Sequence, residues 1–411
     1  MWQRRARGGA LRPHRCGHGQ RRARHARGGP AREPRGGVGR TGRFQPARPA
    51  RRHHPAVRPG NRPAPAGARR RAAGRPDGNQ PESGDPAGCR SVTAAAGPVG
   101  VISNPGSGHN RDQFDAIAAR LARCSALEHA VTTHPDDIDP VLARFAAAGT
   151  AVLAINGGDG TASAVLGRLL ESAHFPSPPL IVLLPGGTAN MNAGDVGVRG
   201  PLGKAVERFC RWCEGPRESA GLRRERCMLR VTGLRAEPVY SMFLGAGAVI
   251  HGTEYAHERI HSRGLRDDFS LALGTARTVW GVLRNDPRFN RHVGIRLALD
   301  DAPAQHFDTL ILAVSTLQRL SFGMRPFFGE GPGDIRLTLF EQGCSRFART
   351  FASIIRGRPN RNAVPASGYH SHNAQRLRLD MRGGVNLDGE VLQADGPFEV
   401  SAAGPLAFLR L

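Results

Sequence analysis

Large apolar side chains are nearly absent from the first 90 residues of this 411-residue sequence. That stretch consists almost entirely of Arg, Gly, Pro, Ala and His, with very few Val, Ile, Leu or Phe. A segment with so little apolar surface to bury cannot offset the conformational entropy that folding removes. We therefore predict that residues 1–96 form a disordered arm and that folded structure begins after it.

The arm also lacks the features of a targeting segment. It has no apolar core of the kind found in secretory signals, and its Pro and Gly residues interrupt any amphipathic helix that a transit peptide needs. The formal net charge of the chain is +24, of which about +19 falls in the arm and about +5 in the remainder. Three interpretations stay open: a translated stretch upstream of the true start, a dispensable tail, or an arm that attracts phosphates nonspecifically. No specific nucleic acid partner is predicted.

Long hydrophobic runs and paired cysteines are missing as well. No window approaches the roughly 18 continuous apolar residues of a membrane span, so any membrane contact is expected to be peripheral. The seven cysteines are an odd set without disulfide-like spacing, which is typical of a reducing compartment. Cys210 and Cys213 form a Cys-x-x-Cys pair with Cys227 nearby, but a zinc site needs four ligands and a redox motif needs a strand-to-helix setting. We predict two half-buried helix cysteines and a cytoplasmic protein.

From Gly97 onward, short apolar runs alternate with segments of helical periodicity. The runs at residues 97–102, 128–133, 151–155 and 180–184 predict strands, and the segments between them predict helices. This repeated alternation is typical of a parallel sheet with helices on its faces. The predicted fold class is α/β, with a doubly wound, Rossmann-like nucleotide domain at residues 97–217.

After about Cys227 the pattern changes to strand-like alternation. Strands are expected at residues 228–231, 293–298, 310–314, 335–340, 377–379 and 398–400. This predicts a second, mostly antiparallel β domain at residues 218–400, with residues 401–411 returning to the first domain. At residues 269–283 apolar positions occur almost all round a predicted helix, which favours a core-facing helix over a lipid groove.

Three glycine-rich loops follow strands of the predicted parallel sheet. Gly157-Gly158-Asp159-Gly160-Thr161 ends one strand and opens a helix, so backbone N–H groups and the positive end of the helix dipole face any phosphate there. Asn104-Pro105-Gly106-Ser107-Gly108 and Pro185-Gly186-Gly187-Thr188-Ala189-Asn190 follow two other strands. Because carboxyl ends of parallel strands line one crevice, we expect the three loops to converge. Asp159 is the natural residue to hold Mg²⁺ on a bound nucleotide or to act catalytically on the transferred group.

These loops, in this order and spacing, resemble those of the diacylglycerol kinase catalytic domain family, which includes sphingosine and ceramide kinases. The resemblance covers roughly Val99 to the C-terminus. It implies an ATP-dependent lipid kinase that phosphorylates diacylglycerol or a sphingoid-type lipid at the inner membrane face, with ATP and Mg²⁺ as cofactors. The implied ATP-binding residues are Asn104, Pro105, Gly106, Ser107, Gly108, Thr132 (or Thr133), Gly157, Gly158, Asp159, Gly160, Thr161 and the following residues to Ala164, Gly187, Thr188 and Asn190.

The resemblance also gives a role to Leu387-Asp388-Gly389-Glu390-Val391. From the residues alone, Asp388-Gly389 between alternating side chains predicts a tight hairpin turn. The family carries an Asp-Gly-Glu motif at this place, whose glutamate accepts the proton of the lipid hydroxyl. By this resemblance Glu390 is the general base and Asp388 helps to hold the geometry or the metal.

Two departures from the family pattern concern carboxylates. Family members carry an acidic residue in a loop that binds a structural Mg²⁺, and the matching stretch here has Pro332 at that place, so Glu330 or Asp334 is expected to substitute. The third glycine loop commonly continues Asn-Asp, whereas this chain has Asn190-Met191-Asn192. The second carboxylate is therefore missing or displaced to Asp195.

Other functions remain as alternatives. His257-Glu258-Arg259-Ile260-His261 fits the His-Glu-x-x-His string of zinc hydrolases, although no third ligand follows at a helpful spacing. An NAD kinase-like enzyme shares the Gly-Gly-Asp-Gly-Thr loop, and a catalytically weak ATP-binding relative is a further alternative. The sequence does not specify the lipid, and a homodimer is left open.

Overall fold

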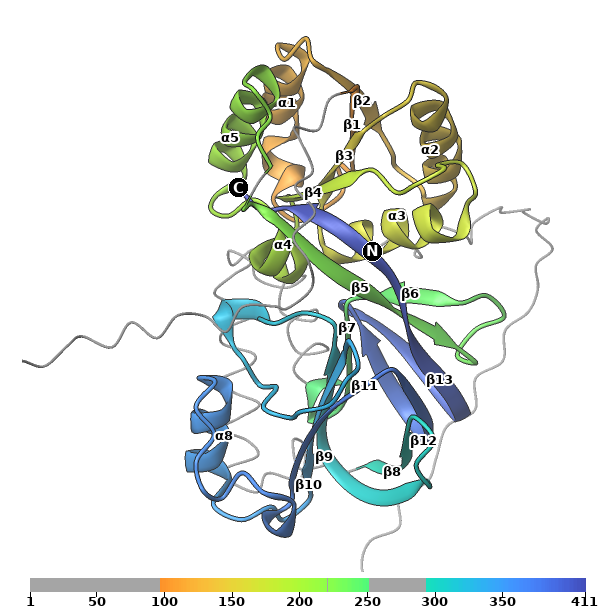
Figure 1. The fold of residues 1–411 in the computed structure, drawn as a ribbon, viewed down its shortest axis with the longest axis vertical. Coiled ribbons are helices and arrows are strands. Elements are labelled where there is room, and N and C mark those ends of the chain that lie inside the picture. The colour runs from red at the N-terminus through yellow and green to blue at the C-terminus, as the bar shows by residue number, and fades with distance from the viewer. Residues whose placement is uncertain (1–96, 220, 251–292) are drawn as a thin grey trace, which may run out of the picture. The chain divides into compact units, whose positions relative to one another are not determined.

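The computed structural model describes residues 97–219, 221–250 and 293–411, which belong to one compact unit (Figure 1). The predictions for the arm at residues 1–96, for the helix at residues 269–283, and for His257, Glu258 and His261 lie outside the described residues. The described part is a mixed α/β structure with a strand-rich C-terminal half, which confirms the predicted fold class at that level.

The first lobe, β1–β4 with α1–α5, alternates strands and helices along the chain. Its elements are β1 (Val99–Ser103), α1 (Asn110–Ala122), β2 (Leu127–Val131), α2 (Ile138–Ala147), β3 (Val152–Gly157), α3 (Asp159–Glu171), β4 (Leu180–Pro185), α4 (Met191–Val196) and α5 (Leu202–Glu214). The four strands pair in parallel in the order β4-β3-β1-β2. The parallel sheet that the apolar runs predicted is therefore present.

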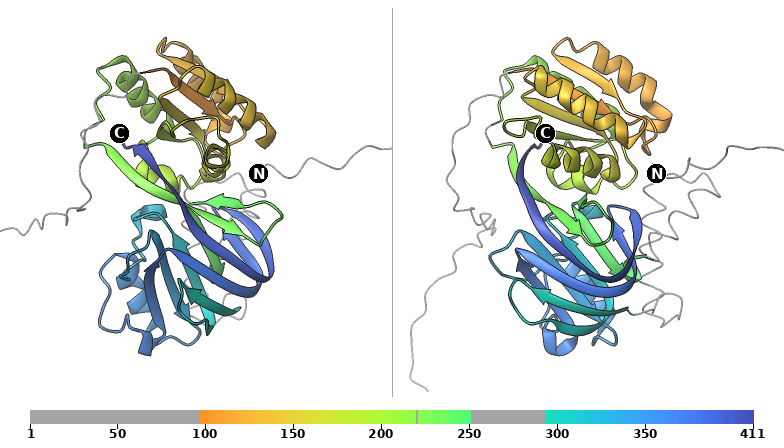
Figure 2. Two further views of the ribbon diagram at one scale, coloured as in Figure 1. Left: turned by 45° about the vertical axis from the view of Figure 1, so that its right-hand side comes forward. Right: turned by 90° about the vertical axis from the view of Figure 1, so that its right-hand side faces the viewer.

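Helices cover both faces of this parallel sheet (Figure 2). Along β3, Leu153 and Ile155 pack with residues of α2 and α3, whereas Val152 and Ala154 pack with residues of α1 and α5. Because alternate strand residues point to opposite faces, a strand buried on both sides must be apolar throughout. This explains why β1, β3 and β4 read as continuous apolar runs.

The second lobe, β5–β13 with α8, is built from antiparallel pairs. Its strands are β5 (Arg223–Thr232), β6 (Val239–Ser241), β7 (Phe243–Gly247), β8 (Val293–Leu299), β9 (Gln305–Ser315), β10 (Ile335–Glu341), β11 (Tyr369–Ala374), β12 (Arg376–Leu387) and β13 (Glu390–Leu409). Neighbouring strands in this lobe pair antiparallel throughout the described residues. Their inner faces enclose a separate apolar core.

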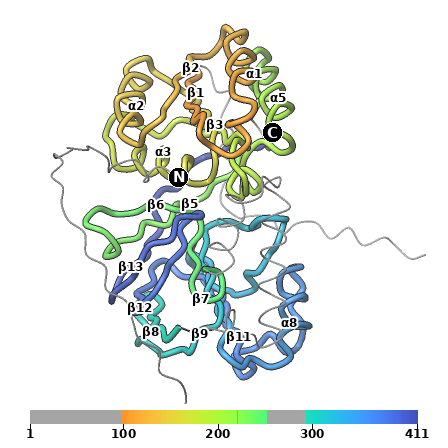
Figure 3. The backbone as a smooth tube through the Cα atoms, turned by 180° about the vertical axis from the view of Figure 1, so that it is seen from behind, coloured from red at the N-terminus to blue at the C-terminus, as the bar shows by residue number. Residues whose placement is uncertain are grey.

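Strand β13 links the two lobes. It pairs with β12 from Glu390 onward, continues against β5, and at Phe408 pairs in parallel with Ile181 of β4 (Figures 1 and 3). The strands of both lobes thus form one hydrogen-bonded sheet. The domain boundary predicted at residue 400 falls inside this strand.

Helix α8 (Phe347–Ile355) was not predicted from the sequence. Its Phe347 and Phe351 lie edge-on to Phe340 of β10, beside the fully buried Tyr369 of β11. None of the helices in the described part of the chain is long and apolar enough to cross a membrane.

Candidate active site

The three glycine-rich loops meet at one edge of the parallel sheet. They follow β1, β3 and β4, which are neighbours in the sheet and run in the same direction, so their carboxyl ends lie together. The Asn110 backbone N–H donates to the Gly186 carbonyl over 3.2 Å and so ties the first loop to the third. The convergence that the sequence predicted is present.

Side chains of the first loop bind the second loop. The Asn104 amide donates to Thr161 Oγ1 over 2.9 Å, and the Ser107 hydroxyl lies 3.2 Å from the same oxygen. Ser107 Oγ also accepts the Gly158 N–H over 3.2 Å. These contacts hold the opening of α3 against the loop that follows β1.

Glycine is required where the loops touch. A Cβ on Gly187 would collide with Gly158 Cα, and a Cβ on Gly108 would collide with the Thr188 hydroxyl. At both positions the neighbouring loop fills the space that a side chain would need. Glycine therefore lets the loops pack directly against one another.

The third loop is fixed by its own asparagine. Asn190 has a left-handed backbone, with φ of 47°, and its side-chain amide exchanges hydrogen bonds of 2.8 Å and 2.7 Å with the backbone N–H and carbonyl of Gly187. Asparagine tolerates this conformation better than most residues. The geometry accounts for Asn190 at the start of α4.

The Asp159 carboxylate lies at the junction of the second and third loops. Its two oxygens accept the backbone N–H groups of Met191 and Asn192 over 3.0 Å and 2.8 Å, which caps α4. Burial raises the pKa of Asp159, and the two backbone hydrogen bonds act against that rise. Asp159 therefore presents a fixed, partly buried carboxylate.

Asp388 reaches this region from the second lobe. It occupies the turn between β12 and β13 with φ of 47°, and its Oδ2 accepts the Ser163 hydroxyl over 2.5 Å and the Met242 N–H over 2.8 Å. Burial, and then the negative charge of Asp159, raise the pKa of Asp388 to about 7. Asp388 Oδ1 is buried without a hydrogen-bond partner among the described residues. Two neighbouring carboxylates, one with an unused oxygen, fit a divalent cation.

Other buried polar atoms near the loops also lack partners within the described residues. They are Thr132 Oγ1, Asn110 Oδ1, Asn156 Oδ1 and both side-chain atoms of Asn192. Buried polar groups are normally hydrogen-bonded, so a cluster of unsatisfied ones points to a polar ligand or water. Together with the exposed loop backbone, this arrangement fits a nucleotide phosphate.

Comparison with known proteins identifies the domain that carries these loops. Residues 98–216 match the diacylglycerol kinase catalytic domain. The predicted resemblance is confirmed over these residues, and the match indicates a kinase. None of the curated proteins matches the chain.

Solved structures share the fold of this diacylglycerol kinase-like chain. One diacylglycerol kinase from Bacillus anthracis str. Sterne aligns with 14% identity and a TM-score of 0.50, and another, provisionally named so, aligns with 16% identity and a TM-score of 0.52. Each alignment covers 76% of this chain and 96% of the other. At such identities the likeness concerns the fold alone.

Outside the kinase-like domain, Glu390 lies at the start of β13 on the exposed side of the β12–β13 turn. Its Oε1 accepts a hydrogen bond of 2.6 Å from Arg235, which lies between β5 and β6. Both side chains are well exposed, so the pair adds little to stability. The catalytic role predicted for Glu390 stays a prediction.

Glu330 and Asp334, which were predicted to bind the structural Mg²⁺, contact residues outside the glycine loops. Asp334 accepts the Cys227 thiol over 3.5 Å, while Glu330 is exposed and its carbonyl accepts the Asn373 N–H. The described residues contain no group of three or more His, Cys, Asp or Glu suited to a metal. Asp195 is buried and accepts Arg226 Nε over 3.0 Å, so it serves an ion pair between α4 and β5.

The Cys-x-x-Cys pair lies in the helix core of the kinase-like domain. Cys210 and Cys213 are both buried on α5, against α1 and β4. Burial raises the pKa of Cys210 to about 11 and that of Cys213 to about 12. Both thiols therefore favour the protonated form. The predicted helix location is confirmed, and the two side chains are more deeply buried than the half-buried state that the sequence predicted.

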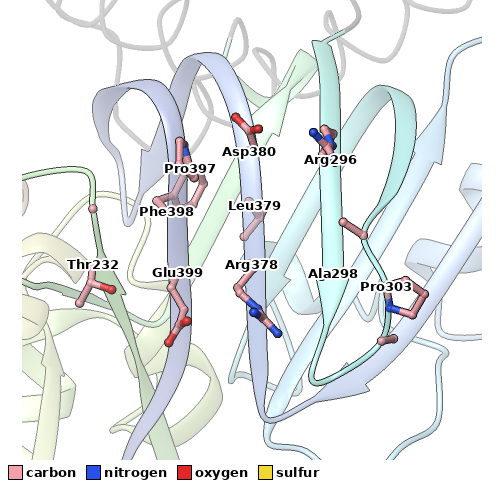
Figure 4. A pocket seen from close by; sticks show the side chains of 13 residues that line it. Thr232, Arg296, Ala298, Pro303, Arg378, Leu379, Asp380, Pro397, Phe398 and Glu399 are labelled. Carbon is pink, nitrogen blue, oxygen red and sulfur yellow. The ribbon is translucent and has the colours of Figure 1, made fainter.

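A hollow of about 680 Å³ lies elsewhere, along β8, β12 and β13 (Figure 4). Arg296, Arg378, Asp380 and Glu399 line it. Asp380 lies at the opposite end of β12 from the turn that carries Asp388. The hollow is open and has side chains of both charges. None of the residues that line it belongs to the glycine loops.

The sequence placed Ser163 in the implied ATP-binding stretch 158–164 but did not predict its bond to Asp388, and it missed Arg235 altogether. Ser163 lies four residues after Asp159, so the two share a face of α3, and this spacing is a usable signal. Arg235 lies in a turn between two strands, and no sequence pattern predicts that it meets a residue 155 positions later.

Proposed function

We propose that this protein is an ATP-dependent lipid kinase that transfers the γ-phosphoryl group to the hydroxyl of a diacylglycerol or sphingoid-type lipid. The observation that carries the proposal is the meeting of three glycine loops with Asp388 of the second lobe. The domain match over residues 98–216 supports the phosphoryl-transfer part. The choice of a lipid as the phosphate acceptor rests on the resemblance to the diacylglycerol kinase family.

In this proposal the loops bind ATP. The exposed backbone N–H of Gly160 approaches the phosphates, with the N-terminus of α3 behind it, while the N–H groups of Gly158 and Gly187 hold the loops through Ser107 and Asn190. Thr132, Thr188 and the unsatisfied asparagine oxygens complete the polar lining. Glycine at positions 158 and 187 lets the second and third loops pack closely, and Gly160 faces open space where a phosphate can approach.

Asp159 and Asp388 would hold Mg²⁺. The raised pKa of Asp388 reflects burial and the charge of Asp159, and a cation beside both would relieve that repulsion. A bound Mg²⁺ supplies charge neutralisation on the phosphoryl group. The hydrogen bonds from Met191, Asn192 and Ser163 keep both carboxylates oriented.

Glu390 acts as general base in the proposed reaction. Arg235 binds its Oε1, which leaves Oε2 to accept the proton of the lipid hydroxyl. The hydroxyl oxygen then forms a bond to the γ-phosphorus while the bond from that phosphorus to the bridging oxygen breaks, and ADP leaves. Positioning and charge neutralisation supply most of the rate enhancement in such transfers.

Because the substrate is a lipid, the proposed enzyme works at the inner membrane face from the cytoplasm, as a peripheral protein. The described helices do not cross a membrane, so lipid must enter from the bilayer surface.

The test is transfer of labelled phosphate from ATP to a panel of lipids by the full chain. The panel contains diacylglycerol, a sphingoid base and a long-chain alcohol, with NAD as a non-lipid acceptor. Glu390→Gln should lower transfer by about 10²-fold or more, because it removes the base. The matched control is Glu237→Gln, an exposed glutamate in the same β5–β6 region that should keep full activity.

Unchanged transfer by Glu390→Gln would defeat the proposed base. Transfer to NAD in place of the lipids would favour the NAD kinase-like alternative. ATP binding without any transfer would favour a catalytically inactive relative. Equilibrium binding of an ATP analogue to both variants separates loss of chemistry from loss of the nucleotide site.

A further inference from the structure

Four arginines gather where α4, the β5–β13 ribbon and the loop after β9 meet. We name Arg199, Arg224, Arg319 and Arg410 the hinge arginine cluster. They come from positions far apart in the sequence and from both lobes. Arg199 is exposed and the other three are partly buried.

The pairing of β5 with β13 places two of them together. Arg224 is the register partner of Phe408, two residues before Arg410. Residues two apart on a strand share a face, so Arg224 and Arg410 project from the same side of the ribbon as diagonal neighbours. The Arg410 N–H donates to the Leu222 carbonyl over 2.9 Å, which fixes this end of the ribbon.

Backbone contacts bring in the remaining two arginines. The Arg199 N–H donates to the Leu411 carbonyl over 3.2 Å, so Arg199 lies beside the residue that follows Arg410. The Gln318 N–H donates to Asp195 Oδ2 over 3.2 Å, which places Arg319 at the same junction. The C-terminus lies beside α5 in Figures 1 and 3, in agreement with these contacts.

The acidic charge at this junction is already in use. Asp195 has a side chain only 3% exposed, and its Oδ2 binds Arg226 Nε over 3.0 Å. Burial, followed by the charges of Arg199, Arg319 and Arg224, lowers the pKa of Arg410, and Asp195 acts in the opposite direction. Positive charge is therefore concentrated here beyond what the neighbouring carboxylate neutralises.

We infer that the hinge arginine cluster binds a phosphate-type dianion, supplied either by a free phosphomonoester or by the headgroup of a phospholipid. Planar guanidinium groups bind phosphate oxygens through paired hydrogen bonds. An anion bound between several of these groups offsets the repulsion between their positive charges. The ligands come from the loop between α4 and α5, from β5, from the residue that follows β13 and from the loop after β9. Binding should therefore tighten the connection between the lobes.

This site is separate from the glycine loops, and its test does not depend on kinase activity. The first measurement is the melting temperature of the full chain as inorganic phosphate replaces chloride at constant ionic strength. Wild type should be stabilised progressively by phosphate. Arg410→Ala and Arg224→Ala should each weaken phosphate binding by at least about tenfold, since each removes a charged hydrogen-bonding partner. Arg123→Ala, an exposed arginine after α1, is the matched control and should respond like wild type.

Two further readouts separate a binding role from a structural one. In chloride alone, Arg410→Ala should melt no lower than wild type, because it removes repulsion between like charges. Arg410→Lys should keep part of the phosphate response. A phosphate response unchanged in Arg410→Ala would assign the ion to another site, such as the glycine loops, and would overturn the inference.

Vesicle binding distinguishes the two sources of the dianion. Phosphatidylcholine vesicles are compared with vesicles that also contain phosphatidic acid, a phosphomonoester, or phosphatidylglycerol, a diester. Binding to phosphatidic acid vesicles that is lost in Arg410→Ala identifies a lipid headgroup. A phosphate response without such binding identifies a soluble phosphomonoester. Absence of both would refute the site.

Discussion

The Ser163 hydroxyl donates a hydrogen bond of 2.5 Å to Asp388 Oδ2 and so joins α3 of the first lobe to the β12–β13 turn of the second. The same oxygen accepts the Met242 N–H, just before β7 begins. Three segments distant in the sequence therefore meet at one carboxylate. The position of the proposed catalytic turn depends on this contact.

Replacing Ser163 with alanine should destabilise the protein. The change leaves a buried carboxylate oxygen with one hydrogen bond fewer, which costs about 1–3 kcal/mol. Urea unfolding of Ser163→Ala measures the loss, and Ser177→Ala, at an exposed serine in the loop before β4, is the control. Equal stability of the two variants would contradict a structural role for the bond.

Asp388 should make stability depend on pH. Its pKa is raised to about 7 in the folded state, from 3.8, so the folded protein binds more protons than the unfolded chain between these values. Stability should fall as pH rises from about 4 through about 7, and stay lower above that range. Comparing Asp388→Asn with wild type at pH 5 and pH 8 isolates the effect, because the variant lacks this titration. If the free energies of unfolding of wild type and Asp388→Asn differ by the same amount at pH 5 and at pH 8, the pKa of Asp388 is not raised. Added Mg²⁺ should lessen the wild-type fall.

Two glycines in the loops should respond in opposite ways to alanine. Gly187→Ala places Cβ against Gly158 Cα, where backbone cannot move aside, and should cost roughly 1–3 kcal/mol. Gly160→Ala meets open space on the first turn of α3, so stability should be kept or raised by up to about 1 kcal/mol. If phosphates approach Gly160, ATP binding should weaken in this second variant although its fold is intact. Thermal melts with ATP titrations test both.

The buried pair between Asp195 and Arg226 should be important for stability. Asp195→Asn leaves the Arg226 guanidinium partly buried beside a neutral amide, and a loss of about 3 kcal/mol is expected from breaking such a pair. Chemical unfolding gives the value. Glu207→Gln, at an exposed position on α5, should change little, and a similar small effect for Asp195→Asn would mean that water compensates the pair.

Local patterns were enough to predict the parallel sheet and its loops. Apolar runs such as β4 have few alternatives to a buried strand, and the glycine loops have few alternatives to a turn at the strand end. Since parallel strands place their carboxyl ends together, convergence of the loops followed without coordinates. The antiparallel half could be predicted as strands but not as pairs, because alternation does not specify partners.

Contacts between distant segments could not be predicted. Arg235 binding Glu390, and Asp195 binding Arg226 instead of serving the third glycine loop, are set by how strands align across the sheet. The start of β5 at Arg223 was also missed, since its first residues are charged and read as a loop. Pairing with the end of β13 makes them a strand.

The course of β13 has a consequence for synthesis of the chain. The edge of β4 is covered by Phe408, a residue made more than two hundred positions after β4 itself. The first lobe emerges from the ribosome before the second but lacks its last strand until residues 400–409 follow. Folding of that half should therefore finish only late in translation, and its open edge is a place where nascent chains can associate wrongly.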